Sequence, residues 1–296
     1  MNEVSTRILI GCAAAAGLSA VSVWNYRRFM PKPEPLGEKR YRVTVQKVPV
    51  RASGHTLYGE LLLPKGKQGP LPTVICCHGF CSTYRLCKGA MGMSLAMSGY
   101  AVYCFDFYGG SKHSRSGGSL LEMSIFTERE DLRHVIRAVR SFPSTDPNRL
   151  FLLGESQGGC VAGITAPEFQ DELRGLILYY PAFCIPEDAR KKFQRVEDIP
   201  EVSKTFGQNV GKVYNEKLLD YDVYDGIRKY DRPVLIMHGD KDRLVPIAYG
   251  KKAAEVYPHA RFETFPGEIH GFTGAGKKKA IRMTYAFLEE LQHDKQ

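Results

Sequence analysis

The chain has 296 residues, of which 43% are hydrophobic and 25% are charged, and its net charge at neutral pH is +9. This composition is that of a folded protein with a sizeable buried core, and it excludes a disordered chain. No basic run is interleaved with aromatic residues, so the positive charge indicates a basic solvated surface and no nucleic-acid partner.

The eight cysteines contain no CxxC pair, so neither a zinc site nor a redox centre is predicted. Several cysteines lie in apolar strand-like runs, where a cysteine behaves as a small hydrophobic residue. We therefore expect mostly free thiols, which favours reducing surroundings.

The first predicted element is an uncharged apolar segment, residues 8–24 (ILIGCAAAAGLSAVSVW). Its length is at the short end of a membrane-spanning helix, and it ends in aromatic residues suited to the headgroup region. We expect residues 1–30 to form an N-terminal membrane anchor, with a signal peptide as the alternative. The basic residues that follow indicate a cytoplasmic catalytic domain, the alternative being a secreted or surface-exposed one. The proline-rich residues 31–39 are expected to be a stiff spacer.

Residues 40–296 are expected to form one domain. Residues 41–50 and 56–64 alternate as an antiparallel strand pair does. Bare apolar runs follow, which suit strands buried on both faces of a parallel sheet, at 73–79, 100–109, 150–156, 173–181, 233–240 and 260–267. Helical spacing fills the gaps at 88–99, 127–142, 251–258 and 278–292, and Thr127 with Glu130 is expected to form a capping box. The alternation predicts an α/β fold, a mostly parallel, doubly wound sheet with an antiparallel start.

About fifty residues of mixed charge separate the strand that ends at Tyr180 from the strand that begins at Pro233. An insertion there would cover the carboxyl ends of the strands, where open α/β sheets bind ligands. We expect a cap at about residues 182–230, a plain surface insertion being the alternative.

The stretch FLLGESQGGC places Ser156 between Gly154 and Gly158, after a predicted strand and before a predicted helix. A sharp strand-to-helix turn needs these glycines and exposes the serine hydroxyl near a helix N-terminus, which favours developing negative charge. The pattern therefore predicts that Ser156 is a nucleophile.

A serine nucleophile needs a base and a group that orients the base. His270 is the best placed histidine, because it lies between the last predicted strand and the C-terminal helix. Asp242 follows the strand before it, with Asp240 as a competitor that is expected to hold the turn. The order serine, aspartate, histidine is the one that this kind of fold uses. His78 and His238 have unassigned roles, and the remaining histidines are expected to be solvated or structural.

The oxyanion of an acyl-transfer reaction is usually bound by backbone N–H groups. One donor is expected from Gln157, directly after the nucleophile. The other is expected from Phe80, in the loop after the strand at 73–79, although the neighbouring Cys81 is not separated from it.

Five motifs of this sequence resemble the α/β-hydrolase superfamily over about residues 41–296, and within it the bacterial cinnamoyl (feruloyl) esterases and related serine carboxylesterases. They are HGF (78–80), FDFYGGSKHS (105–114), GESQGG (154–159), HGDKDRLVP (238–246) and IHGF (269–272). The resemblance implies an α/β-hydrolase fold, a triad of Ser156, Asp242 and His270, and an oxyanion hole of Phe80 and Gln157. Two residues depart from the pattern, Glu155 where related esterases commonly have histidine, and Cys81 where small polar residues are common.

The expected function is that of a serine hydrolase that cleaves small carboxylic esters through an acyl-enzyme on Ser156, without a metal or an organic cofactor. The alternatives are a serine aminopeptidase or thioesterase on the same fold, and a catalytically silent, membrane-tethered binding protein. Among the tyrosines of the cap, Tyr221 and Tyr224 are expected to contact the substrate, and Tyr214 could do so too, with packing as the alternative role. The expected partners are an ester substrate and a membrane, and the sequence does not predict the substrate's identity, the oligomeric state or the role of Glu155.

Overall fold

The computed structural model describes residues 31–293. The predicted membrane anchor, residues 1–30, lies outside this part of the chain. Within residues 31–293, no helix has both the length and the apolar character that crossing a membrane requires.

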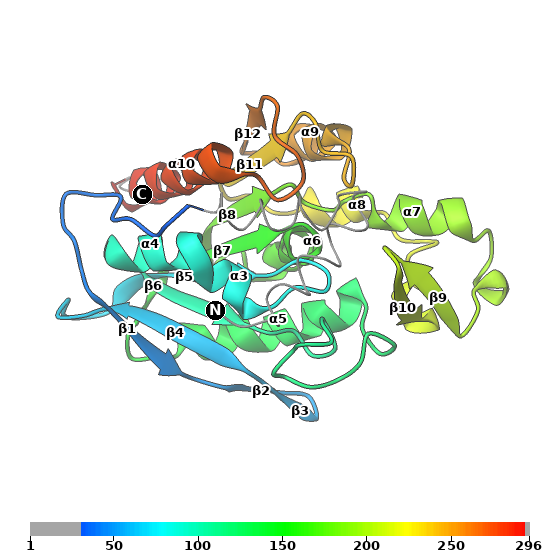
Figure 1. The fold of residues 1–296 in the computed structure, drawn as a ribbon, viewed down its shortest axis with the longest axis horizontal. Helices are drawn as coiled ribbons and strands as arrows, with labels where there is room; N and C mark the ends of the chain where they lie inside the picture. Colours follow the sequence, from blue (N-terminus) through cyan, green and yellow to red (C-terminus); the bar gives the residue numbers. More distant parts are fainter. Residues whose placement is uncertain (1–30, 294–296) are drawn as a thin grey trace.

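An eight-stranded sheet forms the centre of the molecule (Figure 1). Its strands lie in the order β1 (Val43–Lys47), β4 (Gly59–Pro64), β6 (Ala101–Phe105), β5 (Leu71–Cys77), β7 (Thr145–Glu155), β8 (Leu173–Tyr179), β11 (Val234–Gly239) and β12 (Ala260–Phe265). The pairs β1–β4 and β4–β6 are antiparallel and the others are parallel. This arrangement confirms the predicted α/β sheet with its antiparallel start. In the chain, β1 and β4 are connected through a separate hairpin of β2 (Val50–Ala52) and β3 (His55–Leu57).

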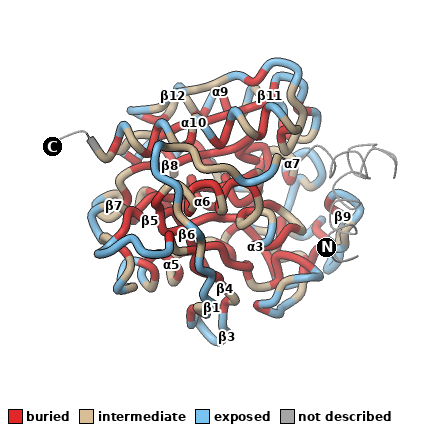
Figure 2. The backbone as a smooth tube through the Cα atoms, turned by 60° about the vertical axis from the view of Figure 1, so that its left-hand side comes forward, coloured by how far each residue is buried: buried red, intermediate tan, exposed pale blue. Residues whose placement is uncertain are grey.

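Helices cover both faces of the sheet, which explains the uninterrupted apolar runs of its central strands. Side chains alternate between the faces, so that in β7 Leu150 and Leu152 join one core while Phe151 and Leu153 join the other. The core with Phe151 is closed by α3 (Tyr84–Cys87), η1 (Lys88–Gly92), α4 (Met93–Met97) and α10 (Gly274–His293). The core with Leu150 is closed by α5 (Ile125–Arg140), α6 (Gln157–Thr165), η2 (Ala166–Phe169) and α9 (Ile247–Val256). Figure 2 shows the buried strands enclosed by partly exposed segments.

The cap of helix α5 differs from the predicted capping box. Ser124 is the N-cap, and its hydroxyl accepts from the Thr127 N–H, while the Thr127 hydroxyl accepts from the Ser124 N–H. Thr127 is thus the third helical residue, and the predicted pairing of Thr127 with Glu130 is wrong. The reason is that Ser124 offers the same hydroxyl chemistry one turn earlier, where four N–H groups lack acceptors.

Residues 31–39 have no regular secondary structure and run along the surface of the domain. The N–H groups of Glu34 and Leu36 donate to the hydroxyls of Ser94 and Ser98 at the two ends of α4. The Glu34 carboxylate also pairs with Lys278 and Arg282 on α10. The segment is therefore docked against two helices, and its role as a spacer stays a prediction.

The chain between β8 and β11 lies beside the sheet, and several of its buried side chains, such as Phe183 and Ile227, belong to the core that contains Leu150. It contains α7 (Ile185–Lys192), η3 (Val196–Asp198), the hairpin β9 (Val202–Thr205) and β10 (Gln208–Gly211), η4 (Lys212–Tyr214) and α8 (Val223–Ile227). In Figure 1, α7 and the β9–β10 hairpin project to the right of the sheet, while α8 lies on the body. We call residues 182–230 the cap from here on, and their status as a separate domain stays a prediction.

Candidate active site

Ser156 lies on a tight turn between β7 and α6, with φ 55° and ψ −121°, a backbone conformation that non-glycine residues rarely adopt. Its N–H donates to the Tyr179 carbonyl at the end of β8 (3.0 Å), which fixes the turn to the neighbouring strand. The turn also needs Gly158, because a Cβ there would lie 2.3 Å from the His78 carbonyl oxygen. The strain and the close packing leave the Ser156 side chain in a cavity at the carboxyl end of the sheet.

His270 contacts both predicted partners. Its Nε2 lies 2.9 Å from Ser156 Oγ, and its Nδ1 lies 2.7 Å from Asp242 Oδ2. Asp242 follows β11 and its side chain is buried, whereas the His270 side chain, in the loop after β12, is 18% exposed. The structure therefore brings the three residues of the predicted triad together in the predicted order of contact.

The environment of Asp242 selects the tautomer of His270. Burial would raise the pKa of the Asp242 carboxyl, but hydrogen bonds from His238 and His270 outweigh it and hold this pKa below its ordinary value. The N–H groups of Leu244 and Val245 also donate to Asp242 Oδ1, both at 2.9 Å. Since an ionised carboxylate only accepts, His270 carries its proton on Nδ1, and Nε2 accepts the Ser156 hydroxyl proton.

The competing residues have structural partners. Asp240 Oδ1 accepts the Gly267 N–H (2.7 Å) and so holds the turn, as predicted. His78 is buried and its Nε2 accepts the Phe107 N–H (3.2 Å), so it is not available as a base. His238, also buried, lies 3.3 Å from Asp242 Oδ2 and 2.9 Å from the Val245 carbonyl oxygen through Nε2. His238 is thus a second imidazole on the acid of the triad, a contact that the sequence alone did not predict.

The structure favours Phe80 over its neighbour Cys81 as the second donor of the oxyanion hole. The Cys81 N–H donates to the Gly110 carbonyl (3.1 Å). Within the described residues, no hydrogen bond is found for the N–H groups of Phe80 and Gln157, and both residues line the cavity at Ser156. Gly79 lets this loop approach the nucleophile, since a Cβ there would lie 3.0 Å from Ser156 Cβ. The arrangement is that of two free donors beside a hydroxyl.

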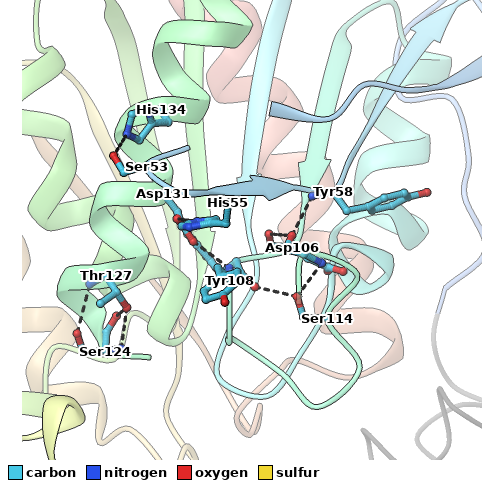
Figure 3. A network of polar contacts seen from close by, with 12 residues as sticks. Ser53, His55, Tyr58, Asp106, Tyr108, Ser114, Ser124, Thr127, Asp131 and His134 are labelled. Carbon is cyan, nitrogen blue, oxygen red and sulfur yellow. Dashed lines mark hydrogen bonds and ion pairs between the residues drawn. The ribbon is translucent and has the colours of Figure 1, made fainter. Parts of the chain in front are cut away.

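The loop that accepts the Cys81 N–H is itself held by two carboxylates (Figure 3). Asp131 accepts from the Tyr108 N–H (2.9 Å) and lies 2.7 Å from His55 Nε2. Asp106 accepts from the N–H groups of Tyr84 (2.7 Å) and Arg115 (2.8 Å). These bonds fix the chain after β6, and through Gly110 they fix the loop that carries Phe80.

The cavity at Ser156 has a volume of about 460 Å³ and lies between the body and the cap. Most of its lining is apolar, and the cap contributes residues of α7, of the β9–β10 hairpin and of η4, among them Ile185, Ala189, Phe206 and Tyr214. Tyr214 also donates a hydrogen bond to Gln157 Oε1 (2.9 Å).

The structure does not bring Tyr221 and Tyr224 to this cavity. They line a separate cavity of about 350 Å³ with Arg190 and Lys252, and Tyr221 packs edge-on against Phe126. The prediction that they contact the substrate is not supported by their positions. Their aromatic rings pack against the body, which was the alternative reading.

Backbone strain is concentrated at the same place. Within residues 31–293, five non-glycine residues have positive φ, namely Cys81, Ser156, Tyr180, Phe206 and Phe272. Cys81, Ser156 and Phe206 line the cavity, while the tilted Tyr180 ring packs against His270 and Phe272 packs against Tyr180. Strained residues cluster at functional sites because only a well-determined surrounding structure maintains them. This observation supports the assignment of the cavity as the active site.

Glu155, the residue of unassigned role, has two buried partners. Its Oε1 lies 2.7 Å from Lys277 Nζ on α10, and its Oε2 accepts the Tyr180 hydroxyl (2.9 Å). The sequence assigns no role to Glu155 and contains no signal for Lys277, which lies 122 residues away in the chain. No pattern of local spacing reports such a contact.

Comparisons with known proteins agree with this geometry. A family model described as "Serine aminopeptidase, S33" matches residues 68–224, just over half of the chain. The uncharacterized peptidase YtmA of Bacillus subtilis is 24% identical over 157 residues, which are 53% of this chain and 58% of YtmA. The non-heme chloroperoxidase CPO-A1 of Kitasatospora aureofaciens is 41% identical over 72 residues, 23% of this chain and 26% of that protein. The matches thus span about a quarter to somewhat over half the length of these curated relatives.

Among solved structures, Est1E from Butyrivibrio proteoclasticus with ferulic acid bound superposes with a TM-score of 0.72. It is 24% identical, and the match covers 82% of this chain and 99% of the Est1E chain. At this level of identity the likeness shows the fold, which confirms the α/β-hydrolase arrangement predicted from the motifs.

Proposed function

This chain belongs to the serine aminopeptidase (S33) family of the α/β-hydrolase superfamily, and we propose that it cleaves carboxylic esters through an acyl-enzyme on Ser156. The observation that carries the proposal is the position of His270, within hydrogen-bond distance of both Ser156 Oγ and Asp242 Oδ2. A hydroxyl so placed can lose its proton as it attacks.

The reaction would run in two halves. Ser156 Oγ attacks the ester carbonyl carbon while its proton passes to His270 Nε2, and the carbonyl oxygen becomes an oxyanion that the N–H groups of Phe80 and Gln157 bind. When the intermediate collapses, the bond to the alcohol oxygen breaks, and the alcohol leaves with the proton from His270. In the second half, a water gives a proton to His270 and attacks the acyl-enzyme, which releases the acid and restores Ser156.

The lining of the cavity supports an ester over a peptide with a free N-terminus. An aminopeptidase must hold the ammonium group of its substrate, which calls for a carboxylate that is not neutralised. Asp188 is the acidic residue that lines the cavity, and Lys191 and Lys192 of the same helix line it as well, so the positive charges of the lining outnumber the negative one. The apolar residues that make up most of the remaining surface, such as Ile185, Ala189 and Phe206, suit an apolar acyl or alcohol group.

A serine aminopeptidase is the second candidate, because the family description and the relative YtmA both point to peptidases. A thioesterase would use the same acyl-enzyme, since the fold does not fix the substrate. Est1E, whose solved structure holds ferulic acid, adds aromatic esters to the substrates worth testing here.

Two experiments test the proposal. A fluorophosphonate probe should label the wild-type protein and not Ser156→Ala, and that variant should lose ester hydrolysis by on the order of 10⁴-fold or more. A folded wild-type protein that resists labelling would instead indicate a catalytically silent binding protein. The second experiment offers p-nitrophenyl esters of increasing chain length, methyl ferulate, an acyl thioester and an aminoacyl anilide. Turnover of the anilide alone would replace the esterase by the aminopeptidase.

A further inference from the structure

A buried ion pair lies directly beside the nucleophile. Glu155 is the last residue of β7, and its Oε1 is 2.7 Å from Lys277 Nζ, with side chains only 2% and 3% exposed. Removing two charges from water costs free energy that their mutual attraction often fails to recover, so apolar replacements are frequently as stable. Stability alone is therefore a poor reason for this pair to be here.

The pair is connected to His270 through an aromatic ring. The Tyr180 hydroxyl donates to Glu155 Oε2 (2.9 Å), so both oxygens of the carboxylate are engaged. The Tyr180 ring lies against the His270 ring, with centroids 4.6 Å apart and planes inclined by 59°. Tyr180 has φ 37°, a backbone conformation that non-glycine residues rarely adopt.

The pair also joins the two segments that carry the nucleophile and the base. Glu155 precedes Ser156 in the chain, and Lys277 lies in the first turn of α10, directly after the loop that carries His270. The ammonium is 5.9 Å from the centre of the Tyr180 ring, and the carboxylate meets the same residue at its hydroxyl, so both charges contact the side chain that backs His270. A contact between the two segments therefore exists besides the hydrogen bond between Ser156 and His270.

We propose that Glu155, Lys277 and Tyr180 are positioning residues, which hold the His270 ring toward Ser156 and balance the charge behind it. The proposal rests on the proposed function, because it assigns to these residues the orientation of the base in that reaction. None of the three lines the cavity at Ser156, and they act on the reacting atoms through the His270 ring, against which Tyr180 packs. Their effect should appear in kcat and in the pH dependence, while substrate binding is left alone.

The experiment measures kcat, KM and the pH profile of kcat/KM for p-nitrophenyl acetate with four variants of the full chain. Tyr180→Phe removes the bond to Glu155 and keeps the ring, so kcat should fall by about tenfold with KM nearly unchanged. Lys277→Met leaves the buried Glu155 carboxyl without its counter-ion, and the fraction that stays ionised favours the protonated imidazole, so the acid limb should move to higher pH. Glu155→Gln leaves the positive charge and should move the limb to lower pH, each by about half to one unit.

The double variant Glu155→Gln/Lys277→Met removes both charges and should return the acid limb to its wild-type position. This variant and Tyr180→Phe decide the question if either single variant fails to fold, because neither leaves an unpaired buried charge. A matched control is the pair of Glu60 and Lys88, 2.6 Å apart on β4 and η1. Its corresponding variants, Glu60→Gln/Lys88→Met, should leave the limb and kcat unchanged.

Several outcomes would overturn the inference. They are an unchanged kcat in folded Tyr180→Phe, a displacement of the acid limb in the same direction in both single variants, a double variant that stays displaced, or a rise in KM alone for Tyr180→Phe. Labelling by the fluorophosphonate separates this failure from that of the proposed function. If the wild type is labelled at Ser156 and the variants behave as the wild type, only the positioning role is wrong, whereas an unlabelled wild type overturns the proposed function itself.

Discussion

At the scale of single residues, the Glu128 carboxyl lies buried behind the oxyanion region. Its Oε2 accepts from Gln157 Nε2 (2.9 Å), and its Oε1 has no partner within the described residues. Burial raises the pKa of Glu128 to about 8; the hydrogen bond from Gln157 opposes this shift, and the negative charge of Asp131 adds to it. A carboxyl with this pKa is mostly protonated at pH 7, and Glu128 adjoins Gln157, whose N–H is a predicted donor of the oxyanion hole.

The substitution Glu128→Gln, which copies the neutral form, should stabilise the protein at alkaline pH. The pKa of this group is raised on folding, so the folded state binds the proton more tightly than the unfolded state. Wild-type stability should therefore fall as the pH rises from the ordinary carboxyl pKa, about 4.3, to about 8. The variant lacks this loss and should gain on the order of a few kcal/mol at pH 9 and little at pH 4.

Urea unfolding of both proteins at pH 4, 7 and 9 measures this gain. The control is Glu130→Gln on the same helix, whose side chain is 56% exposed and should show no such pH dependence. A Glu128→Gln protein whose stability declines with pH as the wild type does would contradict the prediction.

The sequence predicts the role of a residue when that role is marked by a short local motif, and it does not when the role depends on a distant contact. Ser156, Asp242 and His270 each follow a strand in a recognisable short motif, so their meeting could be predicted before any coordinates. The partners of Glu155 could not, because Lys277 reaches it only through the packing of α10 on the sheet. Nothing in the run KKKA distinguishes the lysine that turns inward, Lys277, from the two that follow it.

At the scale of elements, adding one methyl group at Gly158 tests how tightly the turn between β7 and α6 is packed. In Gly158→Ala the added Cβ would lie 2.3 Å from the His78 carbonyl oxygen and 2.5 Å from that of Cys77, both of them backbone atoms. Neither atom can move without disturbing β5 and the oxyanion loop. We expect a loss of several kcal/mol in stability or a failure to fold, and the loss of fluorophosphonate labelling in any folded fraction.

Gly226→Ala is the matched control for that experiment. Gly226 lies within α8, and an added Cβ would meet only the far end of the Tyr221 side chain, at 3.2 Å. Since alanine favours helix over glycine, this variant should be neutral or stabilised by up to about 1 kcal/mol in thermal unfolding. Equal effects of the two substitutions would mean that the turn is not as tightly packed as described.

Elements with strong periodicity were predictable, and those with special turns were not. Helix α5 has apolar residues at helical spacing over sixteen residues, so the sequence predicts the helix and misplaces only its N-cap. The β9–β10 hairpin was not predicted, because its turn places Phe206 and Gly207 at positive φ. Asparagine or aspartate before glycine is the usual signal of such a turn, and phenylalanine gives none.

At the scale of the whole molecule, the cavity belongs to the body and the cap together. The body supplies Ser156, His270 and the oxyanion loop, and the cap supplies the apolar residues of α7 and the β9–β10 hairpin. A sequence can indicate that an insertion covers a site, but which of its side chains face the site depends on how the insertion docks. That is why Tyr221 and Tyr224 were selected, although Tyr214 is the cap tyrosine that lines the cavity.

If the cap limits the size of the substrate, enlarging one of its side chains should change chain-length preference without harming the chemistry. Ala189, on α7, is only 2% exposed and lines the cavity, so Ala189→Leu fills part of the space that a long acyl chain would need. We expect kcat/KM for p-nitrophenyl octanoate to fall by on the order of tenfold to a hundredfold, because one or two displaced methylenes are worth about 1–3 kcal/mol. The value for p-nitrophenyl acetate should stay within about twofold, since Ser156 and His270 are untouched.

Gln194→Leu, just beyond α7 and exposed, adds an apolar side chain outside the cavity and should alter neither rate. Equal losses of kcat/KM for both esters in a folded Ala189→Leu protein would show that the substitution disturbs the catalytic groups and that the cap does not limit the length of the acyl chain.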